Sequence, residues 1–385
     1  MKLDNVKAIY KYGDKIYASM SSGAILCFIG SKPIQIGGIK DCEVTQLRAT
    51  DKELIGLGEM AKYDNPVVLI CKTTGEGKTD AGLCNFTTII APDLAVDNDG
   101  MLCRRNNDNY WEGVMAMGIL DSRPLTFDYI KTTDSEYLAI SRDGTIYTLD
   151  PKNLPEIDTF HWDGHFMQEV HQQMDNDDNE NSNNDDEDNK SGIVVINYID
   201  DFEQDEEEEK EEKAMSIFNS IIPQNLPITG HHPLVQLNFL KLYNRGEGKA
   251  PLVVTAGRDH RFMVHTFDTH EQLIDTDWID PFPYCGTICG NNAYIGCRDG
   301  LIVVMNLVDF TWTIVNTGLD FGFYEATSNK DKIAFSTTDN SVIILNNSTF
   351  EVLDAISVES GIQAIEMADC GLFVLDRNET LTIYQ

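Results

Sequence analysis

Short apolar runs alternate with turn residues along almost the whole chain. The runs are rich in Val, Ile, Tyr and Phe, several alternate apolar with polar positions, and each ends at Gly, Asp, Asn or Pro. This pattern is typical of β-strands joined by tight hairpins, whereas an amphipathic helix would repeat its apolar residues every three or four positions. The hydrophobic pattern therefore predicts an all-β protein.

A pattern of eight residues recurs within this series. Each copy has a turn residue, then a small or turn-compatible residue, then an alternating strand. The copies begin at Ser22, Asn65, Asp99, Asp143, Asp259, Asp299, Asp339 and Asn378. The last four starting positions are separated by 40, 40 and 39 residues, and the first four by 43, 34 and 44. A period near 40 with about four strands per unit is typical of a β-propeller blade.

A second apolar run precedes most of these octets, for example at residues 137–140 and 293–296. We expect these runs to be the second strands of the blades and the octets to supply the third. Asp-Gly pairs at the start of an octet provide the positive φ angles that a tight hairpin needs. The prediction is one closed propeller over residues 1–385, with seven or eight four-stranded blades. A β-sandwich, which also spaces hairpins regularly, is the alternative.

The octet at residues 143–150 reads Asp-Gly-Thr-Ile-Tyr-Thr-Leu-Asp. It resembles the Asp-Gly-Thr-Ile-Arg-Val-Trp-Asp octet of the WD-repeat family and departs from it at residues 147–149. The resemblance extends loosely over nearly the whole chain, and no octet carries the Trp-Asp pair in register. It implies a propeller whose last blade is completed by an N-terminal strand. It also implies an adaptor or subunit of a eukaryotic assembly.

Charge narrows the classes of function. The chain has 63 Asp and Glu against 29 Lys and Arg, a net charge of −34. This excess repels phosphate and argues against a nucleic-acid-binding protein. No apolar run approaches the roughly 18 residues that a membrane-spanning helix needs. Charges every few residues in segment 1–7 predict neither a secretory signal nor a transit peptide.

The acidic charge is concentrated between residues 175 and 213, where eighteen acidic residues and three lysines give −15. We predict an insertion within one blade, in which residues 193–199 form a strand between two disordered acidic loops. A basic client such as a ribosomal protein, a histone or a basic peptide is the expected partner. Alternatively, the loops add only solubility or have no partner. The candidate binding residues are Asp185, Asp186, Glu187, Asp188, Asp205, Glu206, Glu207, Glu208, Glu209, Glu211 and Glu212.

Nine cysteines are scattered among apolar neighbours, an odd number without a disulfide-like spacing. We expect buried reduced thiols and a cytoplasmic or nuclear protein. Cys285 and Cys289 lack a second Cys or His pair at zinc spacing, so we place them on a strand of the blade that contains Asp299.

Residues 72–79 end in Gly-Lys-Thr, like a phosphate-binding loop. Such a loop begins with Gly, where this chain has Lys72, and it must open a helix, whereas residues 80–90 read as a strand. We therefore predict no catalytic, cofactor-binding or metal-binding residue, and a non-enzymatic interaction scaffold. The alternative is a propeller enzyme or a nucleotide-binding protein that uses Lys78 and Thr79.

Overall fold

The computed structural model describes the chain in segments, and its regular structure is almost entirely β-strand. The described residues are 1–63, 65–98, 100–106, 111–116, 126–132, 134–141, 145–153, 228, 230–232, 235–246 and 248–385. Helical structure in these residues is confined to two three-residue 3-10 turns, Pro151–Asn153 and Arg298–Gly300. The all-β prediction is confirmed.

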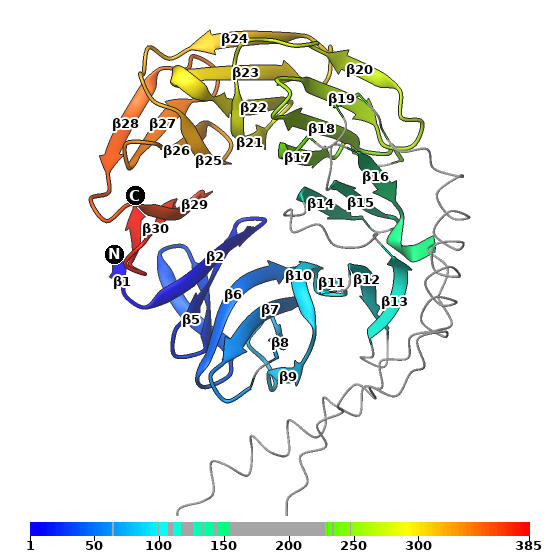
Figure 1. The fold of residues 1–385 in the computed structure, drawn as a ribbon. Helices are drawn as coiled ribbons and strands as arrows, with labels where there is room; N and C mark the ends of the chain where they lie inside the picture. The colour runs from blue at the N-terminus through cyan, green and yellow to red at the C-terminus, as the bar shows by residue number, and fades with distance from the viewer. Residues whose placement is uncertain are drawn as a thin grey trace, which may run out of the picture.

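The strands form eight antiparallel sheets, which are arranged as the blades of a ring (Figure 1). In chain order, the first three blades have four strands each. Blade 1 contains β2 (Val6–Tyr12), β3 (Lys15–Met20), β4 (Ala24–Ile29) and β5 (Lys32–Gly38). Blade 2 contains β6 (Cys42–Ala49), β7 (Glu53–Met60), β8 (Val67–Lys72) and β9 (Asp80–Leu83). Blade 3 contains β10 (Phe86–Ala91), β11 (Leu94–Asp97), β12 (Met101–Arg105) and β13 (Trp111–Ala116).

The next four blades follow the same order. Blade 4 has three strands within the described residues, β14 (Thr126–Lys131), β15 (Glu136–Ser141) and β16 (Ile146–Leu149). Blade 5 contains β17 (Leu237–Tyr243), β18 (Leu252–Gly257), β19 (Phe262–Thr266) and β20 (Gln272–Asp275). Blade 6 contains β21 (Pro283–Cys289), β22 (Asn292–Cys297), β23 (Leu301–Asn306) and β24 (Trp312–Asn316). Blade 7 contains β25 (Phe323–Ser328), β26 (Lys332–Thr337), β27 (Ser341–Asn346) and β28 (Val352–Ser357).

Blade 8 is built from both ends of the chain. It contains β29 (Ile362–Ala368), β30 (Gly371–Asp376), β31 (Leu381–Tyr384) and, as its outer strand, β1 (Lys2–Leu3). β1 pairs antiparallel with β31, and the Ile383 amide donates to the Met1 carbonyl at 2.9 Å. The N-terminal strand thus completes the last blade, as the resemblance implied, and the ring closes.

The repeat pattern predicted the strand order within the blades. Each of the eight octets supplies the third strand of one blade, and the apolar runs before them supply the second strands. In blade 6 the turn residues Asp299 and Gly300 have φ angles of 57° and 66°. The count is eight blades, at the upper end of the prediction, and the ring excludes the β-sandwich. The acidic insertion at 175–213 and its proposed strand at 193–199 lie outside the described residues.

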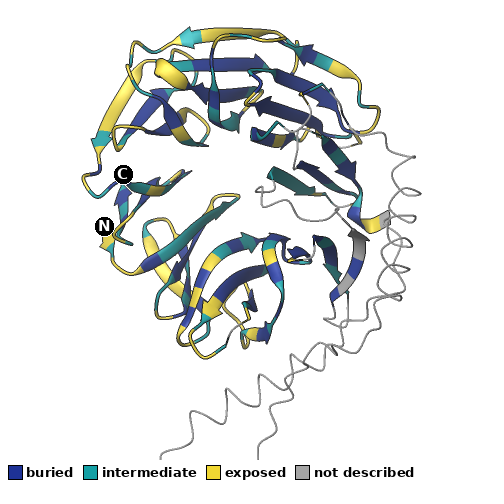
Figure 2. Ribbon diagram, viewed as in Figure 1, coloured by how far each residue is buried: buried dark blue, intermediate teal, exposed yellow. Residues whose placement is uncertain are grey.

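The hydrophobic core is divided into eight clusters, one at each interface between neighbouring blades. Second and third strands are mostly buried, and outer strands are largely exposed (Figure 2). At the closing interface, the Phe28 ring of blade 1 meets the Phe373 ring of blade 8 edge to face, with centroids 5.1 Å apart. Each fully buried side chain of this size stabilises the fold by about 1.5–3 kcal/mol. The ring is therefore held by packing between sheets, because hydrogen bonds of the strand ladders stay within each blade.

Candidate functional site

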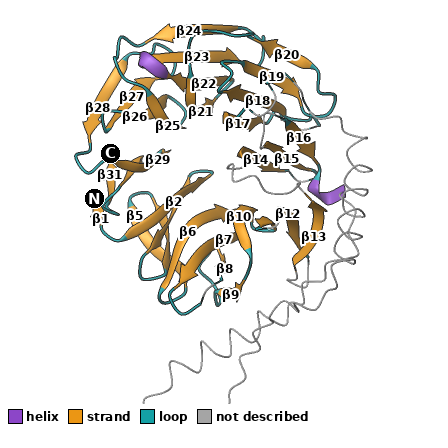
Figure 3. Cartoon of the chain, in the orientation of Figure 1, coloured by secondary structure: helices purple, strands orange, loops and turns teal. Residues whose placement is uncertain are grey.

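The first strand of every blade lies nearest the axis of the ring (Figure 3). We call the region around this axis, where side chains of the first strands meet, the channel. These strands are β2, β6, β10, β14, β17, β21, β25 and β29. We call the end where the first strands begin the bulge mouth, for the reason given below. The end where they turn into the second strands is the hairpin mouth. The two mouths and the channel between them are the candidate functional site.

Basic side chains in the channel are held by rings and carboxylates. The Arg48 guanidinium of β6 lies 5.2 Å from the centroid of the Tyr10 ring and 5.4 Å from that of the Phe127 ring. Burial lowers the pKa of Arg48, although nearby Tyr10 and acidic groups oppose the shift. Lys241 Nζ lies 3.1 Å from Asp128 Oδ1, and the other Asp128 oxygen accepts from the Leu242 amide at 2.7 Å. These contacts join strands of blades 1, 2, 4 and 5 across the channel.

Two carboxylates lie where blades 7 and 8 meet the channel. Glu325 Oε2 accepts from the Ile365 amide at 3.0 Å, and Glu366 Oε2 accepts from the Thr327 hydroxyl at 3.2 Å. Burial raises the pKa of Glu325 to about 7, and repulsion by Glu366 adds to this effect. Burial also raises the pKa of Glu366, against the attraction of Lys11. These two carboxylates therefore take up a proton at a higher pH than an ordinary glutamate does.

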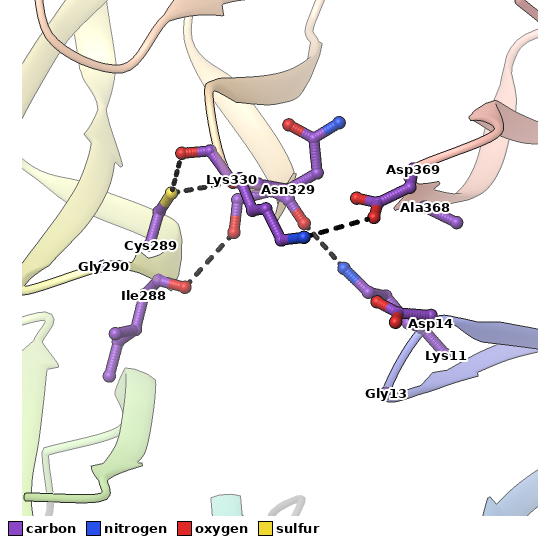
Figure 4. A pocket seen from close by; sticks show the side chains of 11 residues that line it. Lys11, Gly13, Asp14, Ile288, Cys289, Gly290, Asn329, Lys330, Ala368 and Asp369 are labelled. Carbon is purple, nitrogen blue, oxygen red and sulfur yellow. Dashed lines mark hydrogen bonds and ion pairs between the residues drawn. The ribbon is translucent and has the colours of Figure 1, made fainter.

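A cavity of about 270 Å³ opens at the hairpin mouth, between the first hairpins of blades 1, 6, 7 and 8 (Figure 4). Lys330 Nζ lies 3.6 Å from Asp369 Oδ2, and Lys11 Nζ donates to the Ser328 carbonyl at 2.6 Å. The Cys289 thiol donates to the Asn329 carbonyl at 2.8 Å. Asp14 also lines the cavity. The lining holds two lysines, Lys11 and Lys330, and two aspartates, Asp14 and Asp369, so its formal charges sum to zero.

The bulge mouth is shaped by a repeated irregularity. In seven of the eight first strands, the pairing with the second strand shifts register by one residue within the first four residues of the strand. The extra residues are Lys7, Thr45, Thr87, Asn238, Tyr284, Tyr324 and Gln363. A β-bulge re-aims its side chain away from the regular alternation. The bulges therefore set a ring of non-core side chains around one mouth of the channel.

Several bulge residues connect adjacent blades. The Gln363 side-chain amide donates to the Lys7 carbonyl at 3.0 Å, across the closing interface. The Asn238 amide donates to the Pro283 carbonyl at 2.6 Å, between blades 5 and 6. Tyr284 and Tyr324 instead meet through their rings, with centroids 6.0 Å apart. The bulge mouth thus changes from polar to aromatic at blades 6 and 7.

A buried hydrogen-bond network fixes the turn of blade 5 beside this mouth. His231 Nδ1 lies 2.9 Å from Asp259 Oδ1, and His231 Nε2 lies 3.0 Å from the Thr255 hydroxyl. The His232 amide donates to Asp259 Oδ2 at 2.9 Å. The octet pattern predicts Asp259 as a turn residue but does not predict its partner His231. The Gly230-His231 pair, a polar residue after a flexible one ahead of strand β17, was the available signal.

The structure describes some of the candidate binding and reactive residues that the sequence indicated, but not all of them. The eleven candidate acidic residues between Asp185 and Glu212 lie outside the described residues. The Gly-Lys-Thr loop connects β8 to β9, so a strand follows it, and the Thr79 hydroxyl accepts from the Gly38 amide at 3.0 Å. Cys285 and Cys289 lie on β21 of the predicted blade. All nine cysteines are free thiols and eight of them are buried, as predicted.

The described part of the chain has neither a cluster of metal ligands nor a membrane-spanning helix. No group of three or more His, Cys, Asp or Glu side chains there is arranged to hold a metal ion. No helix there is long and apolar enough to cross a membrane.

The fold defines the chain as an eight-bladed β-propeller protein, and solved structures share it. They include the computationally designed Ika8 protein (12% identity, TM-score 0.57), BamB from Moraxella catarrhalis (11%, 0.57) and Sqt1 from Saccharomyces cerevisiae (12%, 0.56). The matches cover 99%, 100% and 99% of this chain and 96%, 98% and 95% of those chains. No family model and no curated protein sequence matches the chain. At these identities the likeness shows the fold alone.

Proposed function

We propose that this protein is a non-enzymatic interaction scaffold, a divergent WD-repeat-type propeller that binds a basic protein or peptide in the cytoplasm or nucleus. The observation that carries the proposal is a net charge of −34 on a closed ring. Of this charge, −15 belongs to residues 175–213 and −19 to the rest of the chain. A ring held by eight packed interfaces offers a rigid surface, and a long-range negative field attracts cations and speeds their association.

The test combines co-purification from the native cell with a salt titration. We expect a basic client to be captured at about 50 mM salt and released progressively towards about 500 mM, because salt screens exposed charges. In a matched variant, the eleven candidate residues between Asp185 and Glu212 are changed from Asp to Asn and from Glu to Gln. This variant should capture less client at low salt. A client that binds equally at both salt concentrations would contradict the electrostatic proposal.

The same preparation separates the scaffold from the nucleotide-binding alternative. Wild type and Lys78→Ala are titrated with ATP and Mg²⁺ in a calorimeter. The scaffold proposal expects no heat of binding from either protein. Binding by wild type that is lost in Lys78→Ala would favour the alternative.

A further inference from the structure

Five aromatic side chains form a continuous strip on the loops at the bulge mouth of blades 5 to 7. The aromatic strip consists of Trp278, His260, Phe282, Tyr284 and Tyr324. Successive ring centroids are 5.3, 5.1, 5.2 and 6.0 Å apart, and the first pair is stacked. The rings come from the turn and the outgoing loop of blade 5 and from the first strands of blades 6 and 7.

The backbone holds the strip in place. His260 occupies the left-handed region with φ 61°, and its Nδ1 lies 3.1 Å from the carbonyl oxygens of both Ile279 and Asp280. Tyr284 and Tyr324 are the bulge residues of β21 and β25. The strip is therefore fixed before any partner arrives, which lowers the entropy cost of binding.

The ends of the strip are exposed. Trp278 is 65% accessible and Tyr324 is 58% accessible, the largest values among the Trp, Tyr and Phe residues of the described chain. Large exposed aromatic side chains in a contiguous row mark interaction sites more often than isolated ones do. Since packing within the protein covers only the middle of the strip, the exposed ends are available to a partner.

The charges next to the strip indicate the kind of partner. Four exposed acidic residues belong to the same loops and turns, namely Asp277, Asp280, Asp299 and Asp320. Two exposed arginines also lie there, Arg258 and Arg298, and Arg298 is weakly paired with Asp299 at 3.7 Å. The partly buried Arg261 lies 3.5 Å from Asp277 and also pairs with Asp275. The carboxylates therefore outnumber the exposed cations around the rings.

We propose that the aromatic strip is the docking surface for a cationic, Lys- and Arg-rich extended segment of a partner protein. Ammonium and guanidinium groups would lie over the ring faces of Trp278 and Tyr324, which attract cations, while the neighbouring carboxylates balance the charge. A purely apolar segment would desolvate these carboxylates without pairing them, at a cost in affinity. The inference rests on the proposed function, because it assigns the basic partner to a particular surface of the ring.

The test uses the full chain and fluorescence anisotropy. The probe is a short labelled peptide of alternating Lys, Arg and Gly. Its matched control replaces Lys by acetyl-lysine and Arg by citrulline, which removes the charge but keeps the length. Trp278→Leu with Tyr324→Leu keeps apolar area at the ends of the strip but removes the ring faces. We expect this double variant to bind the cationic peptide roughly five- to thirtyfold more weakly than wild type.

The control variant is Trp312→Leu, on the outer strand β24, where the Trp312 ring is 40% accessible and outside the strip. It should bind like wild type. Urea denaturation of all variants checks that the ring is intact, and exposed substitutions should leave the midpoint nearly unchanged.

The outcomes separate this inference from the proposed function. If the double variant binds like wild type while the variant neutralised between Asp185 and Glu212 loses affinity, the strip is wrong and the scaffold proposal stands. If Trp312→Leu weakens binding as much as the double variant does, the strip is also wrong. If wild type shows no salt-dependent preference for the charged peptide over the neutral one, the proposal that the protein binds a basic partner is wrong. The proposal that this partner docks on the aromatic strip is then wrong as well. A loss in the double variant that Trp312→Leu does not share supports the strip.

Discussion

Two carboxylates in different blades respond to their surroundings in opposite ways. The Asp259 side chain in blade 5 is 1% exposed. Burial alone would raise its pKa, but hydrogen bonds from His231, from the His232 amide and from the Arg261 amide lower it below the ordinary value. Glu325 in blade 7 is also largely buried, but its carboxylate accepts a hydrogen bond from one backbone amide and is repelled by Glu366. The pKa of Glu325 therefore rises to about 7. The hydrogen-bond donors around a buried carboxylate, and not burial by itself, decide whether its pKa is raised or lowered.

The substitution Asp259→Ala has the largest expected effect and tests whether the donors around Asp259 stabilise the fold. The change leaves His231 and two backbone amides without their acceptor inside the protein. We expect the free energy of unfolding at pH 7 to fall by roughly 3–5 kcal/mol, which is typical when one partner of a buried pair is removed. Urea denaturation measures it. A loss below about 1 kcal/mol would show that water replaces the carboxylate and that the network contributes little.

The same variant has a defined pH dependence. Because the pKa of Asp259 is lowered on folding, its contribution is present above the pKa of the unfolded chain and is lost as pH falls through the folded value. The difference in stability between wild type and Asp259→Ala should therefore shrink as the pH falls below about 4. A difference that stays constant down to pH 2 would contradict the lowered pKa.

Glu325→Gln tests the other carboxylate and should act with the opposite sign. The pKa of Glu325 is raised from 4.5 to about 7, so its contribution is intact below 4.5 and is lost as pH rises through about 7. Glutamine removes that penalty and should stabilise the protein by roughly 1–3 kcal/mol at pH 8, with no gain at pH 4. Thermal or urea unfolding at the two pH values measures this. Destabilisation at pH 8 would mean that the ionised carboxylate is paired, for example with Lys11.

The smallest expected effect belongs to Asp339→Ala, the counterpart of Asp259 in blade 7. Asp339 is exposed, and its Oδ1 accepts from the Ser341 amide at 3.2 Å and from the Thr337 hydroxyl. Water can replace these bonds, so we expect a loss of about 0.5–1 kcal/mol. Equal losses for Asp339→Ala and Asp259→Ala in parallel urea titrations would remove the distinction between the two turns.

Most of the fold was predictable because strand period and repeat spacing are local properties. All eight octets became third strands, including the one at Asp99, although its seventh position is Arg105, where most copies have an apolar residue. The blade number required the ring itself, since a period near 40 permits seven units as well as eight. Asp259 and Asp339 occupy the same position of the octet, so the sequence pattern does not distinguish them. Their different burial depends on the loop that precedes each blade.

The candidate site was much less predictable. Tyr284 and Tyr324 read as ordinary alternating strand residues, and only the bulges at the start of β21 and β25 turn them towards the mouth of the channel. Trp278 lies in a connecting loop that the octet pattern does not include. A bulge depends on pairing between two strands, so a single strand's sequence carries little sign of it.

The two-residue strand β1 determines where the ends of the chain leave the ring. Met1 and Ile383 are joined by backbone hydrogen bonds, and the two ends lie on the paired strands β1 and β31 of blade 8 (Figure 1). A fluorescent protein or an affinity handle fused at either end would therefore project sideways from the rim, clear of both openings. Force applied between the two ends would act on the short β1–β31 ladder before any other. We therefore expect β1 to separate from β31 first and the ring to open between blades 8 and 1.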